Sequence, residues 1–213
     1  QTVTYYYKRK NAANITVHHY EDRTTTELYS QTAGGTPSAV TISGAGKLGL
    51  TEDLTNKVAD ILNYEYVSVD VSGAPSATSP SSTGETTLTH RTTAQTVIYK
   101  YKRKDAGKVV IHHYLLGTTT ELYTPAGKTS PSPEELDGTN KLGLPYTTSD
   151  RTSVPELSDY ELVTPAPTNA TGTFQSGDQT VTYYYRRKNA GNITVNHYEV
   201  GTTTQLYKAT GAS

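Results

Sequence analysis

The feature that most constrains the fold is a ten-residue segment that recurs three times. QTVTYYYKRK at 1–10 returns as QTVIYKYKRK at 95–104 and as QTVTYYYRRK at 179–188. A second shared segment, which contains HHY or NHY, follows each copy after NAAN, DAGK or NAGN. Self-similarity at a long, nearly fixed period is the signature of tandem structural repeats. We expect the last strand of a preceding repeat, two repeats and the start of a third, at 1–10, 11–104, 105–188 and 189–213.

Within the copied segments, apolar or aromatic residues alternate with polar ones, which is typical of strands with one buried face. Lys100 in one copy stands where Tyr184 stands in another, whereas the positions that alternate with it stay apolar or aromatic in both copies. The predicted inward rows are Val97, Tyr99 and Tyr101; Val181, Tyr183 and Tyr185; Ile15, Val17 and His19; Val109, Ile111 and His113; and Ile193, Val195 and His197. An outward position reads His18, His112 and Asn196, and this variation indicates exposure.

The composition limits what a core can contain. Phe, Trp, Met and Cys together contribute one residue, Phe174, so the core must consist of Val, Ile, Leu and Tyr. The 18 Tyr and the frequent Thr favour pleated, half-exposed strands. We therefore expect several small sheets with thin cores rather than one large domain.

One stretch of the first repeat has the spacing of an amphipathic helix. Thr51 is a candidate N-cap for a helix over 51–62. The residues on its apolar face would be Leu54, Val58, Ile61 and Leu62.

The second repeat differs at the same place. Pro155 truncates or removes the equivalent helix. A short helical turn over 130–138, with Pro133 at its first position, is expected instead. The predicted fold class is β-rich α+β, with four or five strands and at most one short helix per repeat, and the repeats are expected to form an elongated rod.

Charge and motifs exclude several function classes. Nineteen basic and 20 acidic residues give a net charge of −1, which argues against nucleic-acid binding. No stretch is long and apolar enough to insert into a membrane, and no signal peptide opens the sequence, so we expect an internal part of an exported protein. No catalytic motif occurs, so we expect no enzyme and no cofactor. His18 and His19 point to opposite faces of a strand and cannot chelate one metal ion together.

An ordered set of motifs in the second repeat covers most of 108–188: VVIHHY, KLGLPYTT, DYELVTPAPTNATGTF and QSGDQTVTYYY. This set resembles the mucin-binding protein (MucBP) repeat family of Gram-positive surface proteins. The first repeat keeps ITVHHY, KLGL, YEYVSV and QTVIYKY but lacks PYTT and NATGTF. The resemblance implies a ubiquitin-like β-grasp fold, an extracellular protein attached to the cell wall, and adhesion to host mucin or other glycans. GTTTEL stands where many members have a VDEDG-like turn, so no ligand-specificity loop is carried over.

Exposed Tyr for stacking on sugar rings and basic residues for acidic groups are the candidate ligand-binding residues. They are Tyr6, Tyr20, Tyr184, Lys102, Arg103, Lys104, Arg186, Arg187 and Lys188. The basic runs could equally provide solubility and discourage pairing between exposed strand edges.

An alternative role is a passive stalk in which each repeat contacts only its neighbours and a distal domain binds. Matched Lys47 and Lys141, with Asn63 and Asp159, raise the hypothesis of internal isopeptide bonds in such a stalk. The NAAN, DAGK and NAGN segments are either linkers or hairpin turns, and the resemblance, which begins at the HHY strand, favours linkers.

Overall fold

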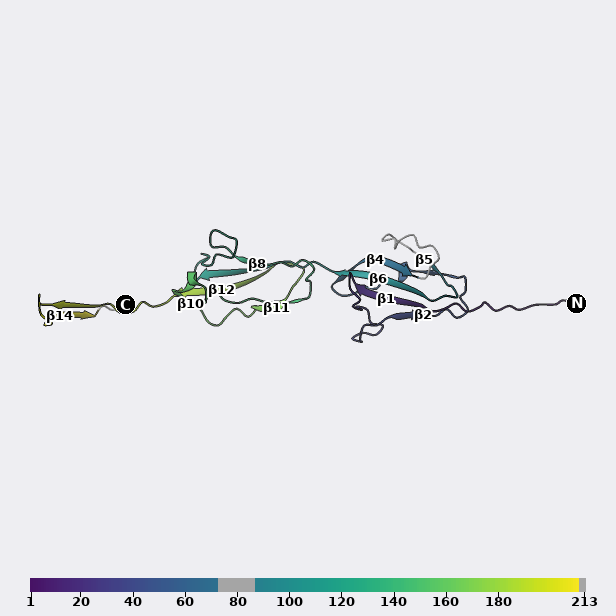
Figure 1. The fold of residues 1–213 in the computed structure, drawn as a ribbon, viewed down its shortest axis with the longest axis horizontal. Coiled ribbons are helices and arrows are strands. Elements are labelled where there is room, and N and C mark those ends of the chain that lie inside the picture. The colour runs from purple at the N-terminus through teal and green to yellow at the C-terminus, as the bar shows by residue number, and fades with distance from the viewer. Residues whose placement is uncertain (73–86, 211–213) are drawn as a thin grey trace. The chain divides into compact units, whose positions relative to one another are not determined.

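The computed structural model describes residues 1–72 and 87–210. Its regular structure consists of β-strands and, among the described residues, two single-turn 3-10 helices (Figure 1). The chain forms two compact units, Gln1–Ala106 with Gly138–Gly143, and Gly107–Asp137 with Leu144–Ser213. The predicted β-rich fold with several small sheets and tandem repeats is confirmed.

The first unit is built on a four-stranded mixed sheet with the order β2-β1-β6-β4. The central strands β1 and β6 are parallel, and each edge strand is antiparallel to its neighbour. The bounds are β1 Ile15–Glu21, β2 Val40–Ile42, β4 Tyr64–Ser72 and β6 Gln95–Arg103. The recurring QTV segment is thus a central strand, which explains why alternate residues along it are buried.

The second unit repeats this arrangement with the order β10-β12-β7-β8. Here β7 and β12 are the parallel central pair, so the HHY and QTV segments again lie side by side. The bounds are β7 Val109–Leu115, β8 Glu134–Leu136, β10 Tyr160–Leu162 and β12 Gln179–Arg187. Because β6 and β7 belong to different sheets, the DAGK segment between them is not a hairpin turn.

Three further sheets have two strands each. Their strands are β3 Thr51–Asp53 with β5 Thr87–Thr89, β9 Pro145–Thr147 with β11 Thr171–Thr173, and β13 Thr194–Tyr198 with β14 Gln205–Thr210. The 3-10 turns are η1 Thr55–Lys57 and η2 Pro155–Leu157.

The predicted inward rows line the cores of both complete repeats. Tyr99 and Tyr101 are each 1% exposed, and Val97 is fully buried. The buried hydroxyls have partners: Tyr99 donates to Leu54 O at 2.7 Å, and Tyr101 Oη accepts from Ala59 N at 2.9 Å. Burial raises the pKa of Tyr101 to about 12, so this hydroxyl stays protonated. Tyrosine can therefore replace the missing Phe and Trp as a core residue.

The predicted helix over 51–62 is wrong. Its first residues form β3, a single 3-10 turn follows, and the remainder is irregular. Leu62 is 85% exposed, so the apolar face is not buried as a unit. Asp53 Oδ1 accepts hydrogen bonds from the backbone and hydroxyl of Thr55 at 2.8 and 2.7 Å, and such local bonds compete with a helix. A segment this short is also marginal as a helix without strong packing.

The predicted helical turn over 130–138 is wrong as well. Residues 134–136 form β8, an edge strand antiparallel to β7. Glu134 lies opposite Ile111 in this pair. Its carboxylate is 3.0 Å from Nε2 of His113 on β7, and this contact within the sheet favours the strand. At the site of the other helix, Pro155 does restrict the structure to the single turn η2.

The inward row predicted for the third copy is also wrong in this structure. Ile193 is 73% exposed, Val195 is 45% exposed and His197 is exposed. Among the described residues β13 pairs only with β14, whereas β1 and β7 each also pair with a QTV strand, 80 and 70 residues later respectively. Without that parallel neighbour, the row has no core to enter.

The first repeat is longer than the second within the Ser/Thr/Pro-rich stretch 72–94. Residues 73–86 of this stretch lie outside the described part of the chain.

Candidate functional site on the outer face of the second repeat

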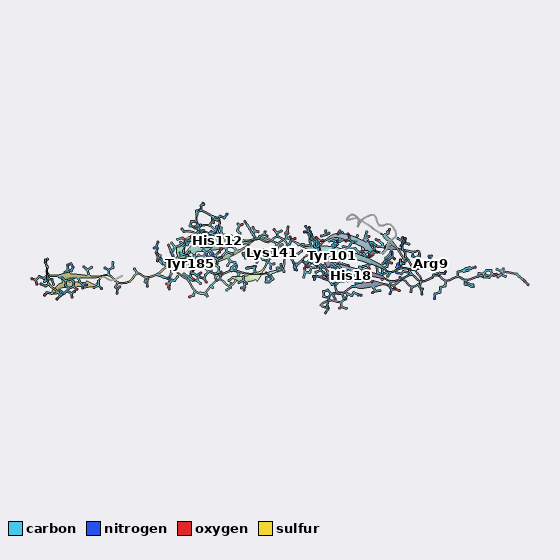
Figure 2. All side chains as sticks on the ribbon, in the orientation of Figure 1. Arg9, His18, Tyr101, His112, Lys141 and Tyr185 are labelled. Atoms are coloured by element: carbon cyan, nitrogen blue, oxygen red, sulfur yellow. The ribbon has the colours of Figure 1, made fainter. Side chains whose placement is uncertain are left out.

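Two tyrosines lie next to each other on the outer face of the β7–β12 pair. Tyr114 and Tyr184 are register partners, with ring centroids 6.3 Å apart. Tyr184 is 42% exposed. His112, labelled in Figure 2, stacks on Tyr114 at 4.7 Å and holds that ring against the sheet. Burial, with a smaller contribution from the Glu121 carboxylate, raises the pKa of Tyr114, so its hydroxyl is available as a donor.

An open groove of about 420 Å³ runs beside Tyr184, and we call it the outer groove. Its lining residues are Val163, Thr164, Pro165, Pro167, Thr168, Asn169, Thr180, Thr182 and Tyr184. Two hydrogen bonds attach the 163–169 segment to β12: Val163 N donates to Tyr184 O at 2.8 Å, and Asn169 Nδ2 donates to Thr180 O at 2.8 Å. One wall of the outer groove is therefore the 163–169 segment attached to β12, and the other wall is formed by the outward-facing residues of β12.

Sequence reasoning found Tyr184 but missed the rest of the outer groove. Thr180 and Thr182 could have been identified from the same alternation that placed Tyr184 outward. The contribution of the 163–169 segment depends on tertiary contacts with β12, which no local pattern predicts.

The first repeat does not have this tyrosine pair. Lys100 stands at the position of Tyr184 and lies opposite Tyr20. Its Nζ atom is 2.6 Å from Asp70 Oδ2. Tyr20 stacks on His18, with ring centroids 4.8 Å apart, as Tyr114 stacks on His112 in the second repeat.

Most of the candidate basic residues have partners within their own repeat. Lys102 pairs with Glu65 at 2.8 Å, and Arg186 pairs with Glu161 at 2.7 Å. Lys188 Nζ donates to Ser158 O at 2.7 Å. The guanidinium of Arg187 lies over the ring of Tyr160, with its Cζ atom 5.2 Å from the centroid. These runs are partly neutralised rather than free positive patches.

The middle arginine of the KRK run has a structural contact in each of two copies. Arg103 donates to Tyr64 Oη at 2.6 Å and to Leu142 O at 3.1 Å. Leu142 is in the KLGL segment 141–144 and belongs to the first compact unit. Arg9, labelled in Figure 2, donates to Leu48 O at 3.1 Å in the earlier KLGL segment. The backbone adds a second contact in each copy. Leu48 N donates to Lys10 O, and Leu142 N donates to Lys104 O, both at 3.2 Å.

Tyr6 lies in a segment without strand structure. Residues 1–14 have no regular secondary structure, and Tyr6 is 92% exposed. The structure therefore does not bring Tyr6 together with Tyr20 or Tyr184.

The two outward histidines are only about one-fifth exposed, because each is held by a glutamate from the TTTEL segment. His18 Nδ1 is hydrogen-bonded to Glu27, which also accepts from His19 N at 3.1 Å. His112 and Glu121 repeat these contacts in the second repeat. The predicted exposure of this position is therefore correct for Asn196 but wrong for His18 and His112, each of which takes part in a structural pair.

The described residues contain no metal cluster, and two of the candidate cross-link residues, Lys47 and Asn63, have other neighbours. Within residues 1–72 and 87–210, no group of three or more His, Cys, Asp or Glu side chains could hold a metal ion. Lys47 Nζ lies 3.4 Å from Glu52, and the side chain of Asn63 lies against Gly143. Neither 3-10 turn has the length or hydropathy of a membrane span, and they are the only helical elements among the described residues.

Known proteins resemble the chain over most of its length. A model of the MucBP domain matches residues 14–102 and 122–186. Internalin J of Listeria monocytogenes serovar 1/2a is 34% identical over 168 residues, which cover 76% of this chain and 17% of that protein. Internalin J of serotype 4b is 31% identical over 210 residues, which cover 96% of this chain and 18% of the relative.

These matches identify an adhesin-type repeat protein of the bacterial surface. The chain spans less than a fifth of the length of either internalin J, which is a Listeria surface protein. The family match covers well over half of the chain, with one matched segment in each of the two repeats. The chain belongs to the MucBP domain family.

Proposed function

We propose that this chain is a non-catalytic part of an extracellular adhesin, attached to the cell wall of a Gram-positive bacterium, that binds mucin or other glycans. The observation that carries the proposal is the neighbouring pair Tyr114 and Tyr184 beside the outer groove. The family membership and the relationship to a surface protein support it.

The chemistry of the outer groove suits a sugar. Aromatic faces stack on the apolar faces of sugar rings, and Tyr adds a hydroxyl that can hydrogen-bond. Thr180 and Thr182 contribute hydroxyls to one wall, and Pro165 and Pro167 contribute apolar surface to the other. A ligand in the outer groove would thus meet both apolar and hydrogen-bonding surface, which is the usual character of small-ligand sites.

Retention on immobilised mucin tests the proposal, with the 213-residue chain as the analyte. Tyr184→Lys, which introduces the residue of the first repeat, is expected to lower retention at least about tenfold. Tyr184→Phe is the matched control and should keep most of it, because the stacking face remains. Lys100→Tyr should increase retention by giving the first repeat a tyrosine opposite Tyr20.

No retention of the unmodified chain at low salt would contradict glycan binding. Equal retention of the chain and Tyr184→Lys, with an unchanged unfolding midpoint, would contradict the outer groove as the site.

A passive spacer is the second candidate function. It is favoured by the basic runs, since Lys102, Arg103 and Arg186 are engaged by their own unit rather than presented to a ligand. In this role neighbouring repeats are the principal partners, and isopeptide cross-links between Lys47 or Lys141 and Asn63 or Asp159 would add strength. An intact mass lower than the sequence mass by one ammonia or one water would support the cross-links.

We further propose a β-grasp fold for each repeat, with boundaries at 11–104 and 105–188. The mixed sheet order, with the first and last long strands parallel at its centre, supports this assignment. The elongated arrangement of the repeats and the assignment of 1–10 and 189–213 to further repeats stay predictions.

A further inference from the structure

The first repeat contains a cleft of about 530 Å³ on the opposite side of its sheet from Tyr20. This volume is within the range of about 300–1,000 Å³ that is typical of small-ligand sites. Val17, Val40 and Ile42 form an apolar floor, and Tyr29 contributes an aromatic ring. We call this the inner cleft.

Charged side chains of both signs line the inner cleft. Lys47 and Lys57 both approach Glu52, with Nζ to carboxylate oxygen distances of 3.4 and 3.3 Å. Asp60 also lines the cleft, so two ammonium groups are balanced by two carboxylates. A balanced set of donors and acceptors gives no net field that would select an ionic ligand.

His19 gives the inner cleft a second, independent feature. The residue is 3% exposed and lines the cleft, and its Nδ1 atom has no hydrogen-bond partner among the described residues. Nε2 is 3.2 Å from Lys57 O, so this nitrogen carries the proton and Nδ1 is an acceptor. Buried polar atoms without a partner are uncommon, and this one leaves an unused acceptor in the wall of the inner cleft.

The second repeat fills the corresponding place with an ion pair. Val40 lies opposite Val17, and Glu134 occupies the matching register position opposite Ile111. Glu134 binds Arg151 through two contacts of 2.7 and 3.0 Å, and His113 Nε2 through a contact of 3.0 Å. Val40 of the apolar floor is thus replaced by a carboxylate that binds a guanidinium, whereas Ile111 and Leu136 keep the other two positions apolar.

We propose that the inner cleft binds one uncharged sugar residue of a glycan. An apolar floor and an aromatic ring suit the carbon face of the sugar, and the mixed acceptors and donors suit its hydroxyl groups. The ligand class rests on the proposed glycan-binding function, whereas the site is separate from the outer groove.

The test is a titration of the isotope-labelled 213-residue chain with N-acetyllactosamine, followed by the chemical shifts of its backbone amides. We expect saturable shifts at Val17, Val40 and Ile42. Val40→Glu, which introduces the residue of the second repeat, is expected to weaken these shifts at least about tenfold in affinity. Asp60→Ala, at the exposed rim, should weaken binding several-fold while the core amides keep their positions. The sialylated form of the same disaccharide should bind no more tightly.

The inference is overturned if the amides of the inner cleft do not shift, or if Asp60→Ala leaves the affinity unchanged. Tighter binding of the sialylated sugar would overturn the preference for an uncharged ligand. Should Val40→Glu unfold the repeat, Asp60→Ala decides alone. Tyr184→Lys separates the two proposals: it should abolish mucin retention through the outer groove and leave the shifts at the inner cleft intact.

Discussion

His113 on β7 and Glu134 on β8 lie beside each other in the second repeat, with Nε2 3.0 Å from Oε2. The other ring nitrogen of His113 lies 2.9 Å from Tyr185 Oη, which itself accepts from Arg151 N at 2.8 Å. The arrangement is satisfied when Tyr185 donates to Nδ1 and His113 donates from Nε2 to the carboxylate. The imidazole is therefore neutral in the folded protein, although it contacts a carboxylate.

This neutral state gives a pH dependence with a definite sign. Burial lowers the pKa of His113 from 6.5, against the hydrogen bond and charge of Glu134, which raise it. The unfolded chain thus binds a proton before the folded chain does, so stability is complete above pH 6.5 and decreases as the pH falls below it. Nitrogen NMR of the ring should show the Nε2–H tautomer of His113 still neutral at pH 6.5. A half-charged ring at that pH, or the Nδ1–H tautomer, would contradict the assignment.

The pair of His18 and Glu27 should be replaceable by the pair found in the third copy. There Gln205 Nε2 donates to Asn196 Oδ1 at 2.9 Å, with the same separation of nine residues. Glu27→Ala leaves the backbone N–H of His19 without its acceptor and is expected to cost about 1–3 kcal/mol in the free energy of unfolding.

The double variant His18→Asn with Glu27→Gln should recover most of that loss in urea unfolding. Glu65→Ala, which removes an exposed ion pair with Lys102, is the control and should cost less than about 1 kcal/mol. A double variant as unstable as Glu27→Ala would show that the charges, and not the shared geometry, stabilise this contact.

Gly172 on β11 should not tolerate a methyl group. A Cβ atom there would lie 2.9 Å from Oη and 3.0 Å from Cζ of Tyr146, whose ring packs on Phe174. Overpacking of this kind typically costs about 1–3 kcal/mol. Gly177→Ala is the matched control, because a Cβ atom at Gly177 meets no atom within 4 Å. Thermal unfolding should separate the two variants, and equal midpoints would mean that the Tyr146 ring moves aside without cost.

Much of the sheet architecture was accessible from the sequence because alternation and repetition act over short distances. Tyr99 and Tyr183 were identified as core residues since they recur at every second position of the same segment. The helix prediction failed where spacing alone was used, because Asp53 offers Thr55 a local hydrogen bond that competes with the helix.

The sites were harder to predict because their residues come from separate segments. Tyr184 was predicted to be outward from its strand, but its neighbours at 163–169 come from a loop docked on β12. At the TTTEL segment the sequence did contain a signal that was missed. Two positions change together between the copies, because the His and Glu of the first two copies are Asn and Gln in the third. Likewise, Glu52 and His90 of the first repeat, 3.1 Å apart, stand where the second repeat has Tyr146 and Phe174.

Arg103 should contribute to stability, whereas its neighbour Lys102 should contribute little. The guanidinium lies over the ring of Tyr64, with Cζ 4.5 Å from the centroid, and bonds both Tyr64 Oη and Leu142 O. Arg103→Ala is expected to lower the free energy of unfolding of the first unit by about 1–3 kcal/mol, because it leaves these partners without a donor. Lys102→Ala removes one exposed ion pair and should change it by less than about 1 kcal/mol. Urea unfolding, with mucin retention measured in parallel, separates the two roles of the basic run. Loss of retention in Lys102→Ala without loss of stability would identify a ligand contact. Loss of stability in Arg103→Ala alone would identify a structural contact.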